Sequence, residues 1–327
     1  MTSPASAAAA APGRARVFGR TLTTDRPLPG LPAAPPADGG HFRVWILRTD
    51  DAHALVPGHR EDSAHVGGAS WSSGITASLA QGADGAEIVI SDTGRFTLHR
   101  DGVHVTHDAP RGVNRAAVAL DLIGTVLPYA LHQDGAWCVH ASAVQCADGV
   151  VAFVAPRGTG KSTLAVACLA AGCALVADDV VVLQGHAGSV RVTPAGVPVR
   201  LRGHTAVAVG AGAGVPDDWG KVRIDGAAAV DEVPLAAIYV LTAVDGEAPV
   251  ERRPRAARAA ALALFTNGKI TELLGAAAAG EALARCTMLA APGVVHDLAV
   301  PRDLARLPEV TAALMAWHGG PPRGQAT

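Results

Sequence analysis

Short runs that alternate between apolar and polar residues mark the first third of the chain. Each run is rich in β-branched or aromatic residues and ends near turn-forming residues, a combination typical of β-strands. The turn Arg100-Asp101-Gly102 joins the last two runs and predicts a hairpin. We therefore expect strands at residues 42–48, 86–91, 95–100 and 103–107.

From residue 114 the pattern changes to helical spacing, which predicts a helix over 114–131. Two buried strands, 137–144 and 150–155, then follow, joined by the turn Ala147-Asp148-Gly149. A helix is expected from Lys161 to Gly172, since glycine often ends a helix. Further strands are expected at 174–179, 180–184, 189–194, 197–202, 234–242 and near 294–300, and helices at about 254–266, 271–285 and 308–317.

These elements divide the chain into two folded parts. Residues 41–112 are expected to form a small, mostly β domain, and residues 113–320 a larger α/β (α+β) domain in which helices pack on a mixed sheet. Several strands after residue 180 follow one another without helices, which argues against a doubly wound Rossmann sheet. Residues 1–40 are rich in Ala, Pro and Gly and predict a disordered tail, and residues 321–327 a second one.

Composition narrows the class of protein. Hydrophobic residues make up 49% of 327 residues and the net charge is −2, so no basic field favours nucleic acid or an anionic membrane as a partner. The five cysteines are odd in number and lack C-x-x-C spacing, which indicates free thiols in a reducing compartment. No run of about 18 apolar residues predicts a membrane span. We therefore expect a cytoplasmic protein.

The segment Arg157-Gly158-Thr159-Gly160-Lys161-Ser162-Thr163 contains the parts of a phosphate-binding loop. Its glycines allow backbone N–H groups to converge on phosphate oxygens, the lysine can reach the β and γ phosphates, and a hydroxyl can hold Mg²⁺. Ala155 stands where the usual pattern has its first glycine. Because Pro156 follows, residue 155 is expected to be extended, a conformation that alanine tolerates.

Three further residues are candidates for chemistry beside this loop. Asp178 and Asp179 end an apolar strand 17 residues after Lys161, and His140 lies in the strand before the loop. Adjacent carboxylates can divide two tasks between them, one holding Mg²⁺ and the other accepting a proton from an attacking hydroxyl. A solvated turn for the aspartates and a core position for the histidine are the alternatives.

The run VHASAV…VAPRGTGKSTLA…AGCALVADDVVVL resembles the catalytic core of HPr kinase/phosphorylase. It is closer to the HPr-kinase-like proteins of bacterial gene clusters, including those that phosphorylate lasso-peptide precursors. The resemblance implies a core like that of HPr kinase and phosphoenolpyruvate carboxykinase. It also implies roles for individual residues: Lys161 as the loop lysine, Ser162 as the Mg²⁺-binding hydroxyl, Asp178 as the base, Asp179 as a further acidic site residue and His140 as an active-site histidine. In the kinase hypothesis, we expect Asp179 to position Mg²⁺ together with Ser162.

The sequence departs from that family at Ala155, at Arg157 (serine in the family pattern) and at Thr163 (glutamate in the true HPr kinases). The missing glutamate, together with the absence of the Gly-rich signature that true HPr kinases carry downstream, argues against the reverse, phosphorolysis reaction and against HPr as the substrate. Whether any phosphorolysis occurs stays open. The resemblance implies an ATP- and Mg²⁺-dependent kinase that phosphorylates a serine-like hydroxyl of a peptide, protein or small molecule. Because related kinases often assemble, a homo-oligomer is a further expectation.

Two other functions stay open from the residues alone. One is a small-metabolite kinase of the shikimate-kinase type, although the loop strand of such kinases normally lies near the start of the chain. The other is a regulatory protein that binds ATP without transferring phosphate. Lys221 and Arg223 lie in a polar stretch, where they either contact the phosphates or face solvent.

Overall fold

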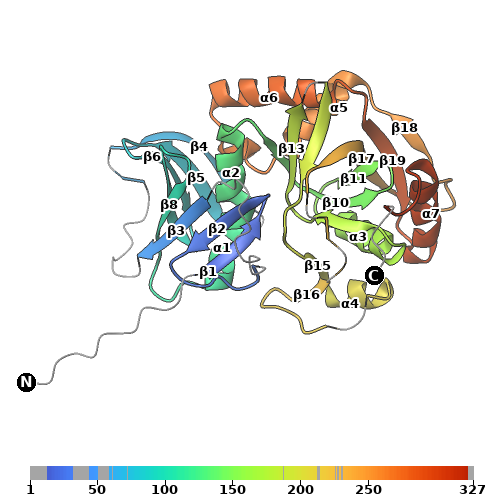
Figure 1. Ribbon diagram of the computed structural model, residues 1–327, viewed down its shortest axis with the longest axis horizontal. Helices are drawn as coiled ribbons and strands as arrows, with labels where there is room; N and C mark the ends of the chain where they lie inside the picture. The colour runs from blue at the N-terminus through green and yellow to red at the C-terminus, as the bar shows by residue number, and fades with distance from the viewer. Residues whose placement is uncertain are drawn as a thin grey trace, which may run out of the picture. The chain divides into compact units, whose positions relative to one another are not determined.

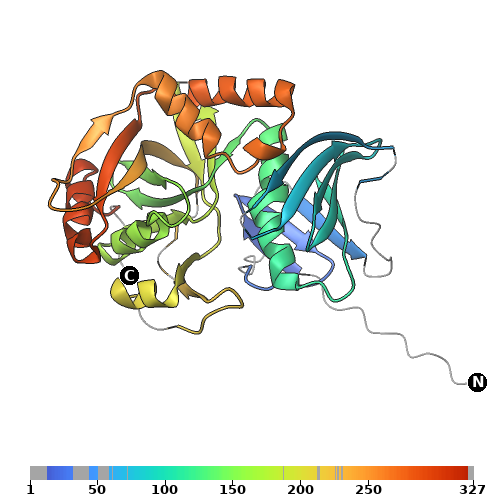
Figure 2. The same ribbon diagram turned by 180° about the vertical axis from the view of Figure 1, so that it is seen from behind.

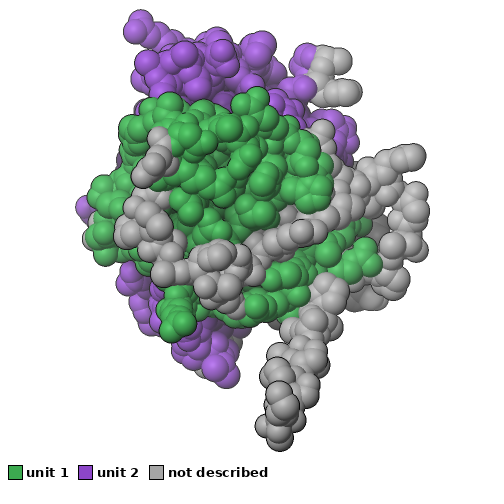
Figure 3. Space-filling view, turned by 90° about the vertical axis from the view of Figure 1, so that its left-hand side faces the viewer, with its two compact units in different colours: residues 1–122 green, residues 123–327 purple. Residues whose placement is uncertain are grey.

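The protein is described by a computed structural model that covers residues 13–31, 44–50, 59–60, 62–71, 73–186, 188–211, 214–224, 226, 228–229 and 231–322. The chain forms two compact units that meet in sequence at Leu122 and Ile123 (Figure 3). Each contains sheets and helices, so the protein is a mixed α+β structure. No helix in the described ranges is both long and apolar enough to cross a membrane.

In the first unit, eight strands of the described chain form one sheet in the order β1-β2-β3-β8-β7-β6-β5-β4. Strand β3 is parallel to both of its neighbours, and the other pairs are antiparallel. Side chains of Leu79, Ile88 and Phe96 are fully buried in its core. The elements are β1 (Gly13–Val17), β2 (Arg20–Thr24), β3 (Val44–Asp50), β4 (Ala64–Ser70), β5 (Thr76–Gln81), β6 (Gly85–Ile90), β7 (Gly94–His99), β8 (His104–Asp108) and α1 (Arg115–Asp121).

The expectation that residues 1–40 form a disordered tail is wrong for residues 13–24. These residues form the hairpin β1–β2, which extends the sheet beside β3. Ala15, Val17 and Leu22 are buried in it. Apolar residues alternate with polar ones here as in the other strands, but the alanine- and proline-rich average of the 40-residue stretch hides this. Residues 1–12, 32–43 and 323–327 lie outside the described residues, and with them the first two residues of the strand expected at 42–48.

In the second unit, a branched sheet of the described residues runs β12-β10-β11-β17-β14-β13-β9. Its long strand β17 is parallel to β11 and to β19, and β18 pairs with β19 at the edge. The strands are β9 (Trp137–Val139), β10 (Ala141–Cys146), β11 (Gly149–Val154), β12 (Ala174–Ala177), β13 (Val181–His186), β14 (Ser189–Thr193), β15 (Val199–Arg202), β16 (Lys221–Ile224), β17 (Val233–Val244), β18 (Arg252–Pro254) and β19 (Val295–Pro301).

Helices cover this sheet in two groups (Figures 1 and 2). Helices α3 and α7 pack on β10, β11, β17 and β19 through a core that includes Phe153, Leu164 and Tyr239. Helix α6 lies along β13 and β9, with α5 beside it. The helices are a π-turn (Leu122–Val126), α2 (Leu127–Gln133), α3 (Lys161–Ala170), α4 (Gly203–Ala208), α5 (Ala257–Thr266), α6 (Ala276–Ala290) and α7 (Leu307–Trp317), with short 3₁₀ turns at Thr271–Leu273 and Leu304–Arg306.

The single strand expected at 137–144 is instead two strands separated at His140. Strand β9 pairs with β13, whereas β10 pairs with β11 and β12. Strands β12 and β13 are likewise separated by Asp178 and Asp179. Both segments, β9–β10 and β12–β13, therefore change pairing partners, one at His140 and the other at Asp178 and Asp179. This change brings the histidine and the aspartates close together.

Candidate functional site

The loop between β11 and α3 has the backbone that its glycines predict. Gly158 and Gly160 have φ of +86° and +103°, the left-handed region that glycine adopts without strain. A Cβ atom at either position would meet nothing within 4 Å. Ala155 is not among the described residues with positive φ, so alanine at that position requires no strained backbone. The loop therefore leaves open space beside an unstrained chain.

Helix α3 begins directly after the loop. In an α-helix the first N–H groups have no acceptor within the helix, and no side chain of the described residues caps α3 at Gly160. The positive end of the helix therefore faces the open side of the loop. Open space and available N–H groups together fit a bound phosphate.

Lys161 starts α3 and is 6% exposed. Its Nζ donates to the carbonyl oxygens of Ala155 at 2.7 Å and Pro156 at 3.3 Å. Burial lowers the pKa of Lys161 to about 8, although Asp179 and Asp178 act in the opposite direction. Both of these hydrogen-bond acceptors of the Lys161 ammonium are neutral carbonyl oxygens. A bound anion would therefore meet a buried positive charge that no carboxylate of the described residues hydrogen-bonds.

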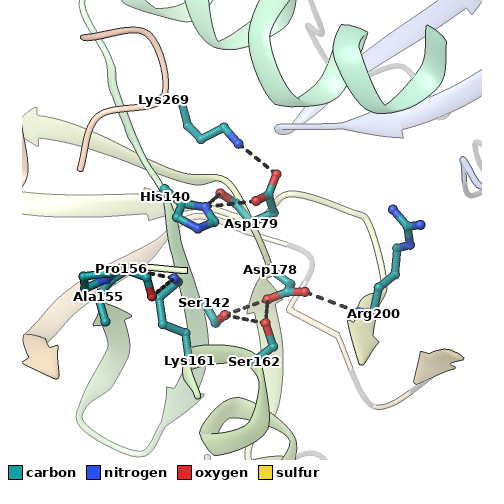
Figure 4. Close-up of polar contacts among 10 residues, drawn as sticks. All are labelled: His140, Ser142, Ala155, Pro156, Lys161, Ser162, Asp178, Asp179, Arg200 and Lys269. Carbon is teal, nitrogen blue, oxygen red and sulfur yellow. Dashed lines mark hydrogen bonds and ion pairs between the residues drawn. The ribbon is translucent and has the colours of Figure 1, made fainter. Parts of the chain in front are cut away.

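Asp178 lies at the end of β12 and accepts three hydrogen bonds (Figure 4). Ser162 Oγ donates to its Oδ1 at 2.7 Å, and Ser142 Oγ donates to the same oxygen at 2.6 Å. The backbone N–H of Arg200 donates to Oδ2 at 3.3 Å. The side chain is thus buried among donors, one of which comes from the first turn of α3.

Asp179 lies in different surroundings, although it is the next residue. Its side chain is 55% exposed, and its carboxylate is held between His140 Nδ1 on Oδ1 and Lys269 Nζ on Oδ2, each at 2.9 Å. Its φ is +70°. Removal from water raises the pKa of Asp179, but Lys269 and His140 outweigh this and hold the pKa well below its ordinary value.

The tautomer of His140 follows from its partners. Nδ1 faces a carboxylate oxygen of Asp179 and also the backbone carbonyl of that residue at 3.3 Å. Both are acceptors, so Nδ1 carries the hydrogen. The other ring nitrogen faces away from Asp179 (Figure 4) and makes no hydrogen bond to the described residues. In the neutral ring Nε2 is therefore a free acceptor.

The structure brings the expected site residues together but changes one pairing. The sequence assigned Ser162 and Asp179 to the metal, whereas Ser162 bonds Asp178. The reason is the turn at Asp179, which directs consecutive side chains to different neighbours. Within the described residues there is no group of three or more His, Cys, Asp and Glu side chains arranged for a metal. Mg²⁺ in phosphate sites commonly takes only one or two protein ligands, so Ser162 with Asp178 fits that ion.

Three contributors were missed by sequence reasoning: Ser142, Lys269 and the backbone of Arg200. Ser142 is two residues after His140, and residues at this spacing in one strand lie on the same face, so the sequence weakly indicated its place near the site. Asn267-Gly268-Lys269 is visible as a turn, but nothing in it indicates a partner 90 residues away. Lys221 and Arg223 lie on β16, which pairs with β15 in a two-stranded sheet. The hydrogen bond from this sheet to Asp178 comes from the backbone of Arg200 on β15 instead.

Comparison with known proteins adds little. No protein family model matches the chain, and no curated protein does. Among solved structures, the chain is similar to the HPr(Ser) kinase/phosphatase from Coxiella burnetii, with 14% sequence identity and a TM-score of 0.29 over 55% of this chain and 95% of that one. So distant a likeness carries no weight here, and the function has to be judged from the geometry of the site.

Proposed function

We propose that the second unit is an ATP- and Mg²⁺-dependent phosphotransferase that acts on a serine-like hydroxyl group of a peptide, a protein or a small molecule. The observation that carries this proposal is the 2.7 Å hydrogen bond between Ser162 and Asp178, directly behind a glycine loop with open space and a buried lysine. A hydroxyl from the loop paired with a carboxylate at a strand end is the arrangement by which loops of this type hold Mg²⁺.

The loop residues from Arg157 to Thr163 would surround the phosphates. Backbone N–H groups of the loop and of the first turn of α3 would donate to phosphate oxygens, and Lys161 would leave its carbonyl partners to contact them. Bound Mg²⁺ would neutralise charge on the phosphates. Asp178 keeps Ser162 oriented, and Ser142 supports Asp178 from the other side.

His140 and Asp179 would handle the proton of the acceptor. Nε2 of His140 is free to accept a hydrogen, while Asp179 holds the ring by Nδ1. This division is that of a histidine base and an orienting carboxylate. It differs from the roles implied by the sequence resemblance, in which Asp178 is the base. Two observations support the change: Asp178 is buried among three donors, and Asp179 is the exposed member of the pair.

Calorimetric titration with ATP and Mg²⁺ tests the nucleotide site. Lys161→Ala should weaken ATP affinity at least tenfold, because an uncompensated phosphate charge remains, and tenfold corresponds to about 1.4 kcal/mol. Arg258→Ala, which removes one positive charge from the exposed face of α5, should retain wild-type affinity. Equal, weak affinity in wild type and Lys161→Ala would refute the nucleotide site.

Transfer itself is tested with γ-labelled ATP and a library of serine-containing peptides and small alcohols, read by mass spectrometry. A mass increase of one phosphate on an acceptor supports the kinase. ATP binding with neither transfer nor slow ATP hydrolysis would instead support a regulatory protein that only binds ATP.

A further inference from the structure

Lys269 lies outside every motif of the sequence, yet its charge is directed into the site. Its side chain is 15% exposed, and its Nζ lies 2.9 Å from Asp179 Oδ2. A solvent-exposed ion pair of lysine and carboxylate contributes little and changes geometry easily. Here the lysine is mostly buried, so the position of its ammonium is determined by its surroundings.

The backbone on either side of Lys269 is paired with the strand that carries His140. The His140 N–H donates to Asn267 O at 2.7 Å, and the Lys269 N–H donates to Cys138 O at 2.9 Å. Val139 and Gly268 form a bridge between these bonds. Three consecutive residues of the turn thus stand in register with residues 138–140. The pairing of residues 138–140 with residues 267–269 therefore places both Lys269 and His140 beside Asp179.

Gly268 shows that this close pairing restricts the sequence. A Cβ atom there would stand 2.2 Å from a ring carbon of Trp137 and 2.4 Å from Thr271 Oγ1. Trp137 is fully buried and donates its Nε1–H to Leu264 O at 3.0 Å, so the ring cannot withdraw without losing that bond. A side chain at position 268 would therefore displace the turn, and with it Lys269.

The π-turn, a short π-helix before α2, packs beside the ion pair. A Cβ atom at Gly124 would lie 3.7 Å from Lys269 Nζ and 3.8 Å from Asp179 Oδ2, both ordinary van der Waals distances. The backbone at Gly124 therefore lies close to both charged atoms. Insertions of this kind into helices are frequent at functional sites.

The backbone of Asp179 has an unfavourable conformation, which its surroundings have to stabilise. Left-handed backbone at a residue other than glycine costs on the order of 1 kcal/mol or more, and Asp179 is one of two such residues in the described chain. The charged or titratable groups near it are Lys269, His140, Asp178 and Lys161. Of these, Lys269 and His140 each occupy one of its carboxylate oxygens, so together they determine how the carboxylate is turned.

We infer that Lys269 is a positioning residue: it holds the carboxylate of Asp179 so that this carboxylate orients His140 through Nδ1. The consequence for turnover rests on the proposed phosphotransfer, whereas the consequence for the histidine does not. Without the ammonium, Oδ2 loses its partner and the carboxylate can rotate away from the ring. Nδ1 of His140 would then keep only the backbone carbonyl of Asp179, at 3.3 Å, as an acceptor, and the ring would no longer be held to one tautomer as firmly.

Lys269→Met tests the inference, since methionine is similar in length and uncharged. Lys269→Arg restores the charge, and Arg258→Met removes a charge from the exposed face of α5 as a control. Thermal unfolding of each variant identifies any that fails to fold. Long-range ¹H–¹⁵N NMR spectra of the nucleotide-free protein at one fixed pH report which nitrogen of His140 is protonated, and His140→Gln assigns the signals.

Wild type, Lys269→Arg and Arg258→Met should show His140 protonated on Nδ1, and Lys269→Met should show a mixture of tautomers. In turnover, Lys269→Met should lower kcat about 10- to 100-fold, by analogy with the range for residues that orient metal ligands through hydrogen bonds. The KM for ATP should stay within about twofold, because the Lys269 ammonium bonds Asp179 and no hydrogen bond joins it to the described loop residues. Lys269→Arg should recover most of kcat.

Two results would overturn the inference: an unchanged His140 spectrum in folded Lys269→Met, or an altered spectrum with wild-type kcat. A variant that only unfolds at lower temperature, with both signals unchanged, would make Lys269 a structural ion pair. If wild type transfers no phosphate to any acceptor, the proposed function fails, and the NMR comparison alone decides whether Lys269 positions the histidine. Should Lys269→Met not fold, the same spectra of Lys269→Arg decide, and a mixed tautomer there contradicts the inference.

Discussion

Asp178 and Asp179 differ because the backbone turns between them, not because of their chemistry. Asp178 ends a buried strand and receives the hydroxyls of Ser142 and Ser162. Asp179 has left-handed backbone, and its carboxylate therefore faces His140 and Lys269. Two identical residues thus lie in different surroundings, one beside the glycine loop and the other beside the histidine.

Asparagine at each position should separate these roles. In Asp179→Asn the amide has one acceptor, and Lys269 can only donate, so the amide oxygen turns to Lys269 and the NH₂ group to His140. The ring must then accept at Nδ1 and carry its hydrogen on Nε2, which removes the base. We expect transfer to fall about 10²- to 10⁴-fold with ATP·Mg²⁺ affinity retained.

Asp178→Asn should act on the metal instead, because the carboxylate charge behind Ser162 is lost. We expect a higher Mg²⁺ concentration for half-maximal activity, measured by titrating Mg²⁺ at saturating ATP. The reverse pattern, with Asp178→Asn inert at all Mg²⁺ concentrations and Asp179→Asn merely requiring more metal, would restore the roles that the sequence resemblance implies.

At the scale of elements, helix α2 and helix α6 meet through a histidine held in its neutral form. Arg285 on α6 donates to His132 Nδ1 at 2.9 Å and also to the carbonyl oxygens of His132 and Ala136. Burial, and then the charge of Arg285, lower the pKa of His132 to about 4. A proton on the ring would face the guanidinium and displace this contact.

Stability should therefore depend on pH through His132. The unfolded chain binds this proton near pH 6.5 and the folded chain only near pH 4, so between these values the unfolded state holds more protons. The free energy of unfolding is fully retained above pH 6.5 and should fall by about 3 kcal/mol as the pH drops to 4. Urea unfolding across this range measures the slope.

His132→Gln should flatten that slope, since the glutamine oxygen can still accept from Arg285 but does not titrate. His204→Gln, at an exposed position on α4, should keep the wild-type slope. Identical slopes in all three proteins would mean that His132 is not the group responsible.

At the scale of the whole molecule, the division into units differs from the boundary expected at residues 112 and 113. The units meet at Leu122 and Ile123, within the helical stretch that contains α1, the π-turn and α2. Six of the seven residues of α2 are buried, and this helix contacts β9. The last part of that stretch therefore belongs to the core of the second unit.

Two fragments test this assignment. A fragment of residues 113–322 should fold and bind ATP·Mg²⁺ within a few-fold of the full chain. A fragment of residues 134–322 lacks α2 and should be unfolded or far less stable, because burying each large apolar side chain contributes about 1.5–3 kcal/mol. Circular dichroism and calorimetry distinguish them. Wild-type stability in the shorter fragment would place α2 outside the core of the second unit.

The sequence alone determined much of the local structure. Alternation and turn residues located β6, β7, β8, β11 and β17, and helical spacing located α3, α5, α6 and α7, because these patterns follow from the geometry of each element. The candidate loop residues could also be named from the sequence, since Gly158, Gly160, Lys161 and Ser162 stand next to or near one another along the chain. The average composition of residues 1–40 was misleading, because it concealed the hairpin at residues 13–24.

Only the tertiary structure decided which of these residues work together. Three features depend on contacts between segments that are separated in sequence. They are the hydrogen bond of Ser162 to Asp178, the end of strand β9 before His140 and the ion pair of Lys269 with Asp179. Such contacts are determined by strand pairing and by packing around buried residues such as Trp137, and the letters of one segment carry no record of its distant neighbours. The sequence specified the groups available for chemistry, and the paired backbone determined which neighbour each of them faces.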